Sequence, residues 1–177
     1  DNVKEIAWRA FMACTNLTEV TIPANTATVG DEAFMKCSAL KSIVVEKGSQ
    51  NYCSENGILY DKSKTTLLKC PEGKEGELVI PNGVKKISHG ALANCKITEV
   101  TIPNSLIEIG KYSFSGCELK SITCNCANPP AMYYKYESGF YGVDKNIPVY
   151  VPSKSVAKYK NSDDWKEFKN IMPISDK

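Results

Sequence analysis

The sequence predicts an α/β repeat solenoid, in which short units of one strand and one turn stack around a continuous core. Apolar residues and cysteines recur at a spacing of 22 or 23 residues, each unit ends in an alternating segment, and a proline closes three of these segments. The chain has 177 residues, of which 42% are hydrophobic and 24% charged, which is the size and composition of one globular domain.

Two pairs of units carry the repeat. The first pair is spaced by 23 residues at six positions: Ile6, Phe11, Cys14, Leu17, Val20 and Ile22 become Val29, Phe34, Cys37, Leu40, Ile43 and Val45. The second pair is spaced by 22 residues: Ile87, Leu92, Cys95, Ile97, Val100 and Ile102 become Ile109, Phe114, Cys117, Leu119, Ile122 and Cys124. Matching chemistry at six positions in both pairs indicates an internal repeat.

Each unit predicts one strand and one turn. Residues 17–22 match the L-x-x-L-x-L core of a leucine-rich repeat, with Thr21 facing outward between two apolar residues. Pro23 ends this strand because proline cannot donate to a continuing ladder. Phe34 and Cys37 lie three residues apart, which favours one helical turn facing the core. Stacking then gives a leucine-rich repeat with a short parallel concave sheet.

The middle and the end of the chain depart from this unit. Between Val45 and Leu78 the Phe–Cys turn is absent, and residues 57–69 form two strand-like segments around a polar turn at 61–64. This pattern predicts a hairpin insert at about 50–76 within a solenoid of residues 1–125. The repeat spacing stops after Cys124, so residues 126–177 are predicted to form a C-terminal cap with a last strand at 147–152.

Composition excludes several functions. The 22 basic and 20 acidic residues give a net charge of +2, which provides no footprint for nucleic acid. Apolar runs are too short for membrane insertion. The single histidine, His89, lies on a variable turn with no nucleophile or acid at a useful spacing, so we expect no enzyme, cofactor or metal site. The chain begins at Asp1 in mid-pattern, so a signal or anchor is expected outside it.

Eight cysteines need an explanation. Four of them occupy one repeat position, and we expect a column of buried free thiols at Cys14, Cys37, Cys95 and Cys117. Disulfides between neighbouring coils are the alternative, and a Cys53–Cys70 bridge is a second one. The spacing of Cys124 and Cys126 does not fit zinc.

The outward side chains of the concave sheet are the candidate binding site. They are Glu19, Thr21, Ser42, Val44, Glu77, Val79, Glu99, Thr101, Ser121 and Thr123. If the units stack in register, Glu77 lies beside Glu99, and a cationic partner group would explain two adjacent like charges. A solvated face without a ligand explains them too. A second candidate is the aromatic run 132–136 with Phe140 and Tyr141, which fits an interface or the packed end of the solenoid.

Several segments resemble the BspA-like leucine-rich repeat family of bacterial surface proteins. They are Val29-Gly-Asp-Glu-Ala-Phe34, Leu17-x-x-Val20-x-Ile22-Pro23, Ile109-Gly-x-x-x-Phe114-x-x-Cys117, the insert at 55–62 and the ending at 150–171. The resemblance implies a non-enzymatic, secreted or cell-surface module that adheres to a host extracellular protein or glycan. A structural stalk or assembly unit of a larger surface protein is the alternative.

Overall fold

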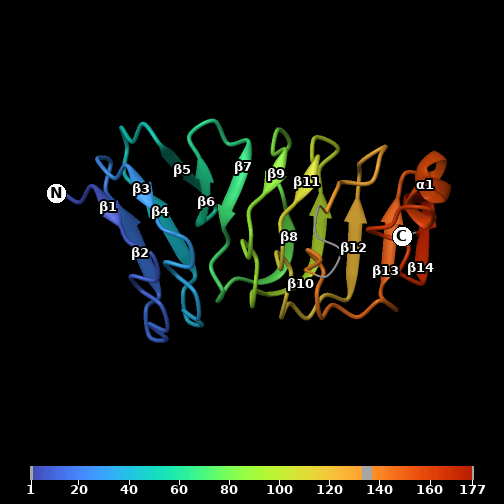
Figure 1. The fold of residues 1–177 in the computed structure, drawn as a ribbon, viewed down its shortest axis with the longest axis horizontal. Coiled ribbons are helices and arrows are strands. Elements are labelled where there is room, and N and C mark those ends of the chain that lie inside the picture. The colour runs from blue at the N-terminus through green and yellow to red at the C-terminus, as the bar shows by residue number, and fades with distance from the viewer. Residues whose placement is uncertain (1, 133–136, 177) are drawn as a thin grey trace.

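The chain winds into a β-solenoid of about eight turns over residues 2–132 and 137–176, the part that a computed structural model describes (Figure 1). The two termini lie near opposite ends of the long axis (Figure 1). The predicted repeat solenoid is therefore confirmed. Five of its turns are named here as coil 1 (residues 5–22), coil 2 (28–45), coil 3 (52–79), coil 4 (86–102) and coil 5 (108–124).

The first strands of the coils form one set of sheets and the second strands form another. The first set pairs β1 (Glu5–Ile6) with β3 (Thr28–Val29) and joins β5 (Tyr52–Glu55), β6 (Ile58–Asp61), β7 (Thr66–Lys69), β9 (Lys86–Ile87) and β11 (Glu108–Ile109). The second set pairs β2 (Glu19–Ile22) with β4 (Ser42–Val45) and joins β8 (Glu75–Val79), β10 (Lys96–Ile102), β12 (Ser121–Cys124), β13 (Pro148–Val151) and β14 (Asn170–Pro173). Helix α1 (Val156–Lys160) and two 3₁₀ helices (Ser153–Ser155 and Ile174–Asp176) complete the assigned elements.

The Phe–Cys turn is not the helical turn that its spacing predicts. In coil 1 the N–H of Met12 donates to the carbonyl of Arg9, three residues back, at 3.0 Å. The N–H of Phe11 instead donates at 2.9 Å to the carbonyl of Ala33 in coil 2. In a helix both N–H groups would bond within the element. The turn therefore alternates hydrogen bonds within a coil and hydrogen bonds between coils.

Left-handed residues make this alternation possible. Coil 1 has two of them, Arg9 with φ 57° and Ala13 with φ 61°. The later turns repeat the pair at Glu32 and Lys36, Gly90 and Asn94, and Tyr112 and Gly116. A non-glycine residue in this region costs about 1–2 kcal/mol, and the hydrogen bonds between coils offset that cost.

Two glycines allow the coils to approach closely just before this turn. A Cβ atom on Gly30 would lie 2.4 Å from the backbone nitrogen of Trp8, and one on Gly110 would lie 2.7 Å from that of His89. Both contacts are with backbone atoms, so a larger residue would have to push two coils apart.

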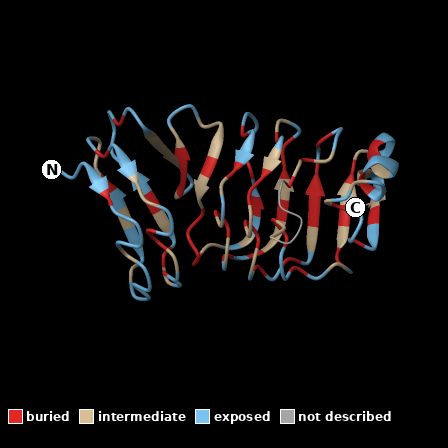
Figure 2. Ribbon diagram, viewed as in Figure 1, coloured by how far each residue is buried: buried red, intermediate tan, exposed pale blue. Residues whose placement is uncertain are grey.

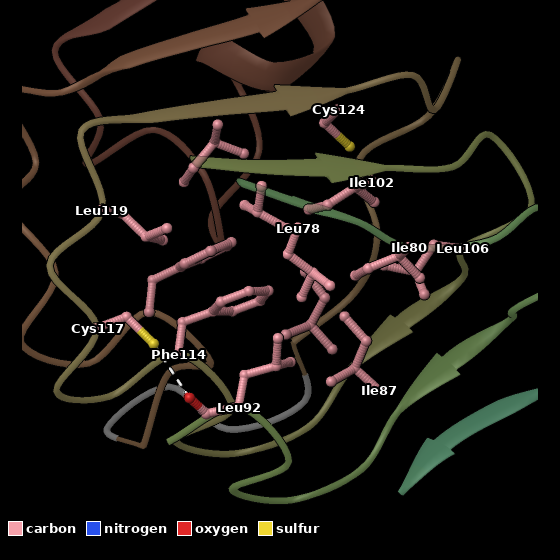
Figure 3. Packing of buried hydrophobic residues seen from close by; sticks show 14 of the residues in the cluster. Leu78, Ile80, Ile87, Leu92, Ile102, Leu106, Phe114, Cys117, Leu119 and Cys124 are labelled. Atoms are coloured by element: carbon pink, nitrogen blue, oxygen red, sulfur yellow. Dashed lines mark hydrogen bonds between the residues drawn. The ribbon is translucent and has the colours of Figure 1, made fainter. Parts of the chain in front are cut away.

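Three of the four repeat cysteines form the predicted column of buried thiols. Cys37, Cys95 and Cys117 are 0%, 1% and 7% exposed. The thiol of Cys37 donates to the carbonyl of Phe11 at 3.0 Å. The thiol of Cys117 donates to that of Leu92 at 3.1 Å (Figure 3). A small apolar side chain with a weak donor therefore suits this position, because it packs and also pairs a carbonyl of the preceding coil.

Cys14 is the exception to this column. It is exposed because it lies in coil 1, whose outer side no other described coil covers. All eight cysteines lie in the described residues and all are free, so neither disulfides between coils nor the Cys53–Cys70 bridge is formed. Burial raises the pKa of the Cys117 thiol to about 12, which keeps it protonated.

Coil 3 divides the core in two. Strand β6 is buried on both faces, because Ile58 and Tyr60 pack into a larger core while Leu59 packs into a smaller core formed with coils 1 and 2. Figure 2 shows dense burial from β6 onward and sparse burial in the first two coils. The single continuous core expected from stacking is therefore replaced by two clusters, with antiparallel strands between them.

Strands β4 and β8 are not neighbours in a sheet. The N–H of Ile43 donates to the carbonyl of Gly57 at 2.9 Å, and the N–H of Val45 donates to Oγ of Ser54 at 2.9 Å. The segment that joins β5 to β6 thus occupies the edge of β4. The prediction of one concave sheet is wrong at this point, because coil 3 places the β5–β6 segment between β4 and β8.

Asp61 holds the turn between β6 and β7. Its carboxylate accepts the N–H groups of Thr65 and Thr66, both at 2.7 Å, and the hydroxyl of Ser63 at 2.8 Å. Partial burial opposes ionisation of Asp61, but these hydrogen bonds outweigh it and keep the pKa of the carboxyl below its ordinary value. The polar residues of the turn therefore stabilise the antiparallel pairing of β6 with β7.

The stack continues past residue 125. Strand β13 pairs in parallel with β12, and β14 pairs in parallel with β13. The ring of Phe140 stacks on Phe114 at 4.9 Å, as Phe34 stacks on Phe11 at 5.5 Å. The predicted strand at 147–152 is present as β13, but the prediction that it is the last strand is wrong. Strand β14 follows it at the repeat spacing, since Pro148 pairs with Asn170, 22 residues later, and it pairs along the parallel edge that β13 presents.

Aromatic side chains of the C-terminal segment pack around Phe140. Trp165 and Phe168 meet its ring edge-to-face at 5.1 and 5.3 Å. The indole N–H of Trp165 donates to the carbonyl of Pro130 at 2.9 Å. Trp165 and Phe168 therefore pack against the turn that contains Phe140.

The thiol content provides one test of this core. Denatured, unreduced protein should react with a thiol reagent at all eight cysteines. Native protein should react fastest at the exposed Cys14, more slowly at the partly exposed Cys53, and slowest at the other six, which are buried. Absorbance of the released chromophore measures the number of reactive thiols and their rates. Fewer than eight reactive thiols after denaturation would show that a disulfide exists.

Substitution of equivalent cysteines provides a second test. Cys117→Ala should lower the free energy of unfolding by about 1–2 kcal/mol, because it removes a buried sulfur and the partner of the Leu92 carbonyl. Cys14→Ala, at the same repeat position but exposed, should change it by less than about 0.5 kcal/mol. Urea denaturation followed by circular dichroism compares the two, and equal losses would contradict the burial argument.

Candidate functional site

The candidate site consists of the outward side chains of the second strand in each coil. In β10, Val100 and Ile102 are buried in the larger core, whereas Glu99 and Thr101 between them are partly exposed. This is the alternation that a strand with one buried face requires. The sequence therefore identified the outward positions of β10 correctly.

The register places the two predicted acidic residues side by side. Glu99 of β10 is the direct partner of Glu77 in β8, and its other neighbour is Ser121 in β12. Thr101 lies between Val79 and Thr123 in the same way. The prediction that Glu77 lies beside Glu99 is confirmed. We name the exposed Glu77 and Val79 and the partly exposed Glu99, Thr101 and Ser121 the strand face.

The other predicted residues do not join the strand face. Glu19 pairs with Ser42 and Thr21 with Val44 on the separate β2–β4 sheet, because coil 3 interrupts the stack. Thr123 is only 7% exposed, and its direct neighbour in β13 is Tyr150. The prediction of Thr123 as an exposed contact residue is wrong, because the stack continues past β12.

An exposed ion pair lies beside the strand face. Glu75 stands two residues before Glu77, and its carboxylate lies 3.4 Å from the ammonium of Lys96. Both side chains of this pair are largely exposed, so solvent screens the attraction. The strand face therefore combines adjacent carboxylates with the exposed apolar side chain of Val79 and the hydroxyl of Thr101.

The remaining sequence candidates have structural explanations. His89 is exposed, and its ring meets Tyr112 edge-to-face at 5.8 Å. Met132 and Phe140 are buried in the larger core, whereas Tyr141 is 56% exposed. Residues 133–136 of the aromatic run lie outside the described residues.

Within residues 2–132 and 137–176, no three histidine, cysteine or acidic side chains gather as a metal ion would require. The helices within these residues are too short and too polar to cross a membrane.

Sequence reasoning missed a cavity of about 590 Å³ on another part of the solenoid. It lies between the turn of coil 2 and the turn of coil 4, with Leu59 and Leu68 of coil 3 at its base. The interruption of the repeat between Val45 and Leu78 was the available signal, because a missing turn leaves its two neighbours unpaired.

A family comparison agrees with this architecture. The profile of the BspA type leucine rich repeat region matches six copies across residues 1–75 and 74–162. The chain belongs to this family. Its profile extends beyond residue 125, in agreement with the continued stack of β13. A search of curated protein sequences gave no significant match.

Solved structures share the fold of this BspA-type chain. A leucine rich cell surface protein from Faecalibacterium prausnitzii is 25% identical, with a TM-score of 0.60 over 97% of this chain and 51% of that one. The pneumococcal vaccine antigen PcpA is 18% identical, with a TM-score of 0.56 over 98% and 60%. A leucine-rich repeat protein from Eubacterium ventriosum is 23% identical, with a TM-score of 0.54 over 77% and 43%. The chain thus spans about half the length of these proteins.

The adjacent carboxylates make a prediction about stability. Glu77→Gln should raise the free energy of unfolding by up to about 1 kcal/mol at low ionic strength, because it removes a like charge from directly paired strands. The gain should shrink at high salt. Glu19→Gln is the matched control, because the partner of Glu19 is the neutral Ser42. Urea titrations at two salt concentrations measure both, and an equal gain in the control would contradict the register argument.

Proposed function

We propose that this BspA-type chain is a non-enzymatic binding module of a secreted or cell-surface protein and that it recognises a host extracellular protein or glycan through the strand face. The observation that carries the proposal is the exposure of Val79, which is 61% exposed between the acidic pair and Thr101. Exposed apolar and charged side chains side by side are typical of recognition surfaces.

The packing of the core under the strand face favours binding. Leu78, Val100 and Ile122 lie on the inward side of the same strands and are buried in the larger core. Side chains presented by a packed sheet lose little conformational freedom when they meet a partner. The strand face is therefore preorganised.

The chemistry of the strand face favours a partner with hydrogen-bond donors. Two neighbouring carboxylates accept well from an ammonium or guanidinium group, and they also accept from the hydroxyls of a neutral glycan. A basic protein segment or a glycan meets this requirement, whereas a phosphate-rich surface does not.

The family supports a role other than catalysis. Repeat proteins of this kind are generally binding or structural modules. The solved F. prausnitzii relative is described as a cell surface protein, which supports a location outside the cell for this chain as well.

A structural stalk or assembly unit is the alternative, and one observation favours it. Coil 1 exposes Trp8 and Met12 on its turn, at 63% and 37%. A further repeat unit stacked on coil 1 would cover these side chains, as coil 1 covers Phe34 of coil 2 through the ring of Phe11. We also propose, for the domain organisation, that the part of residues 126–177 following β13 closes the C-terminal end of the stack.

Charge reversal tests the strand face. The double variant Glu77→Lys, Glu99→Lys should weaken capture of host extracellular-matrix proteins or glycans by about tenfold or more, because cationic side chains repel the donors that carboxylates accept. Glu5→Lys, an exposed residue of β1 outside the strand face, is the matched control. Immobilised matrix proteins and a glycan array provide the probes.

Two results would contradict this proposal. The first is unchanged binding of every captured partner by the double variant. The second is absence of binding together with concentration-dependent association of the chain in sedimentation, which would favour the assembly unit.

A further inference from the structure

The cavity between coils 2 and 4 lies where one turn is missing from the stack. Coils 1, 2, 4 and 5 each contain the full turn with left-handed residues at its two ends. Coil 3 instead passes from β7 to β8 through residues 70–74. The turn of coil 2 therefore has no turn of coil 3 beside it.

The turn of coil 2 has hydrogen-bond donors that face this cavity. In the complete turns the central N–H donates to the next coil, as from Leu92 to the carbonyl of Ser113 at 2.9 Å and from Phe114 to that of Gly139 at 2.8 Å. Two further donors flank the central one at intervals of two residues. In coil 2 the equivalent donors are the N–H groups of Glu32, Phe34 and Lys36.

Only one of these three donors is paired. The N–H of Lys36 donates to the carboxylate of Glu72 at 2.8 Å, and Glu72 is only 3% exposed. No hydrogen bond among the described residues uses the N–H of Glu32 or of Phe34. Phe34 is 2% exposed, and an unpaired N–H at a buried position costs free energy comparable to a lost hydrogen bond.

The turn of coil 4 faces the cavity with acceptors. Its carbonyls at residues 89, 91 and 93 correspond to those that accept from the preceding coil elsewhere. The carbonyl of Ala91 accepts from the N–H of Cys70 at 2.7 Å. Within the described part of the chain, the carbonyls of His89 and Ala93 accept no hydrogen bond. The cavity thus has donors on one wall and acceptors on the other.

We propose that this cavity, the turn groove, binds a short peptide segment of a partner protein. Carbonyl oxygens two residues apart in the peptide accept from the N–H groups of Glu32 and Phe34, as the carbonyls of a following coil do elsewhere. An apolar side chain of the peptide packs on Leu59 and Leu68 at the base of the groove. This is backbone recognition of the kind seen when a strand is added to an open sheet edge.

The spacing of the donors favours a peptide over a small anion. Glu32 and Phe34 are separated by one residue. Their counterparts in coils 1 and 4 donate to carbonyls that are also separated by one residue, whereas those in coil 5, Tyr112 and Phe114, donate to the adjacent carbonyls of Ser138 and Gly139. An extended polypeptide presents a carbonyl on one side at every second residue, whereas the oxygens of one carboxylate or phosphate bond donors that lie close together. The carboxylate of Glu72, which also lies 3.6 Å from the ammonium of Lys69, pairs only one of the three backbone N–H groups, that of Lys36.

The turn groove is independent of the strand face. Most of its lining residues come from the turns of coils 2 and 4 and from strands β5 to β7, and the others are Trp8 of coil 1, Val29 of β3, and Tyr112 and Ser115 of the coil 5 turn. None of them belongs to β8, β10 or β12. A partner can therefore use the groove whether or not the strand face binds a ligand.

A synthetic peptide tests the proposal. Residues 110–117 form the turn of coil 5, whose carbonyls accept hydrogen bonds from the turn of coil 4. A peptide of this sequence with Cys117→Ser is therefore the probe. Added to the whole chain, it should slow hydrogen exchange at the amides of Glu32 and Phe34 about tenfold or more. The amide of Phe11 is already bonded to Ala33 and should not change. Nuclear magnetic resonance resolves the individual amides.

Matched variants localise the binding. Ala93→Tyr fills the groove and should weaken peptide binding about tenfold or more. Met12→Tyr occupies the same repeat position in coil 1, outside the groove, and should leave the affinity unchanged. Glu77→Lys should also leave it unchanged, which separates this proposal from the strand face.

Four results would overturn the proposal. They are no protection of either amide at about 1 mM peptide, equal protection by acetate or inorganic phosphate alone, unchanged binding by Ala93→Tyr, and protection that arises from a dimer of the chain without peptide. The third result would place the peptide elsewhere, and the fourth would identify a second copy as the occupant.

Discussion

The hydrogen bond from the backbone of one coil to the backbone of the next is the constraint on which this solenoid depends. Each complete turn directs alternate N–H groups out of its own coil, which is possible only because residues such as Arg9 and Ala13 are left-handed. The same close approach requires glycine at position 30 and favours a small thiol at position 37. The repeat in the sequence is thus a repeat of backbone requirements as much as of apolar side chains.

Coil 3 lacks the complete turn and therefore the hydrogen bonds that such a turn makes to the next coil. Without the turn, strands β5 to β7 form antiparallel pairs, β6 is buried on both faces, and the core divides into two clusters. The edge N–H groups of β4 donate to Gly57 and Ser54 and not to β8. The second set of sheets is therefore divided between β4 and β8 as well. One local departure therefore accounts for the split core, the split face and the turn groove.

The two candidate surfaces use different chemistry. The strand face offers side chains, with Glu77 and Glu99 adjacent and Val79 exposed on a packed sheet. The turn groove offers backbone groups, with donors at Glu32 and Phe34 and acceptors at His89 and Ala93. The strand face therefore depends on which side chains stand at the outward positions of the strands, whereas the groove follows from the missing turn of coil 3.

The sequence by itself determined the period, the second strand of each coil, the outward positions at Glu77 and Glu99 and the burial of Cys37 and Cys117, because periodic burial is a local pattern. It did not predict the first strand of coils 1, 2, 4 and 5. Tertiary structure decided the form of the turn, the exposure of Cys14, the burial of Thr123 and the break between β4 and β8. The spacing of Phe34 and Cys37 fits a helical turn equally well. Only the neighbouring coil settles where each N–H donates, and that partner is 21 or more residues away in the chain.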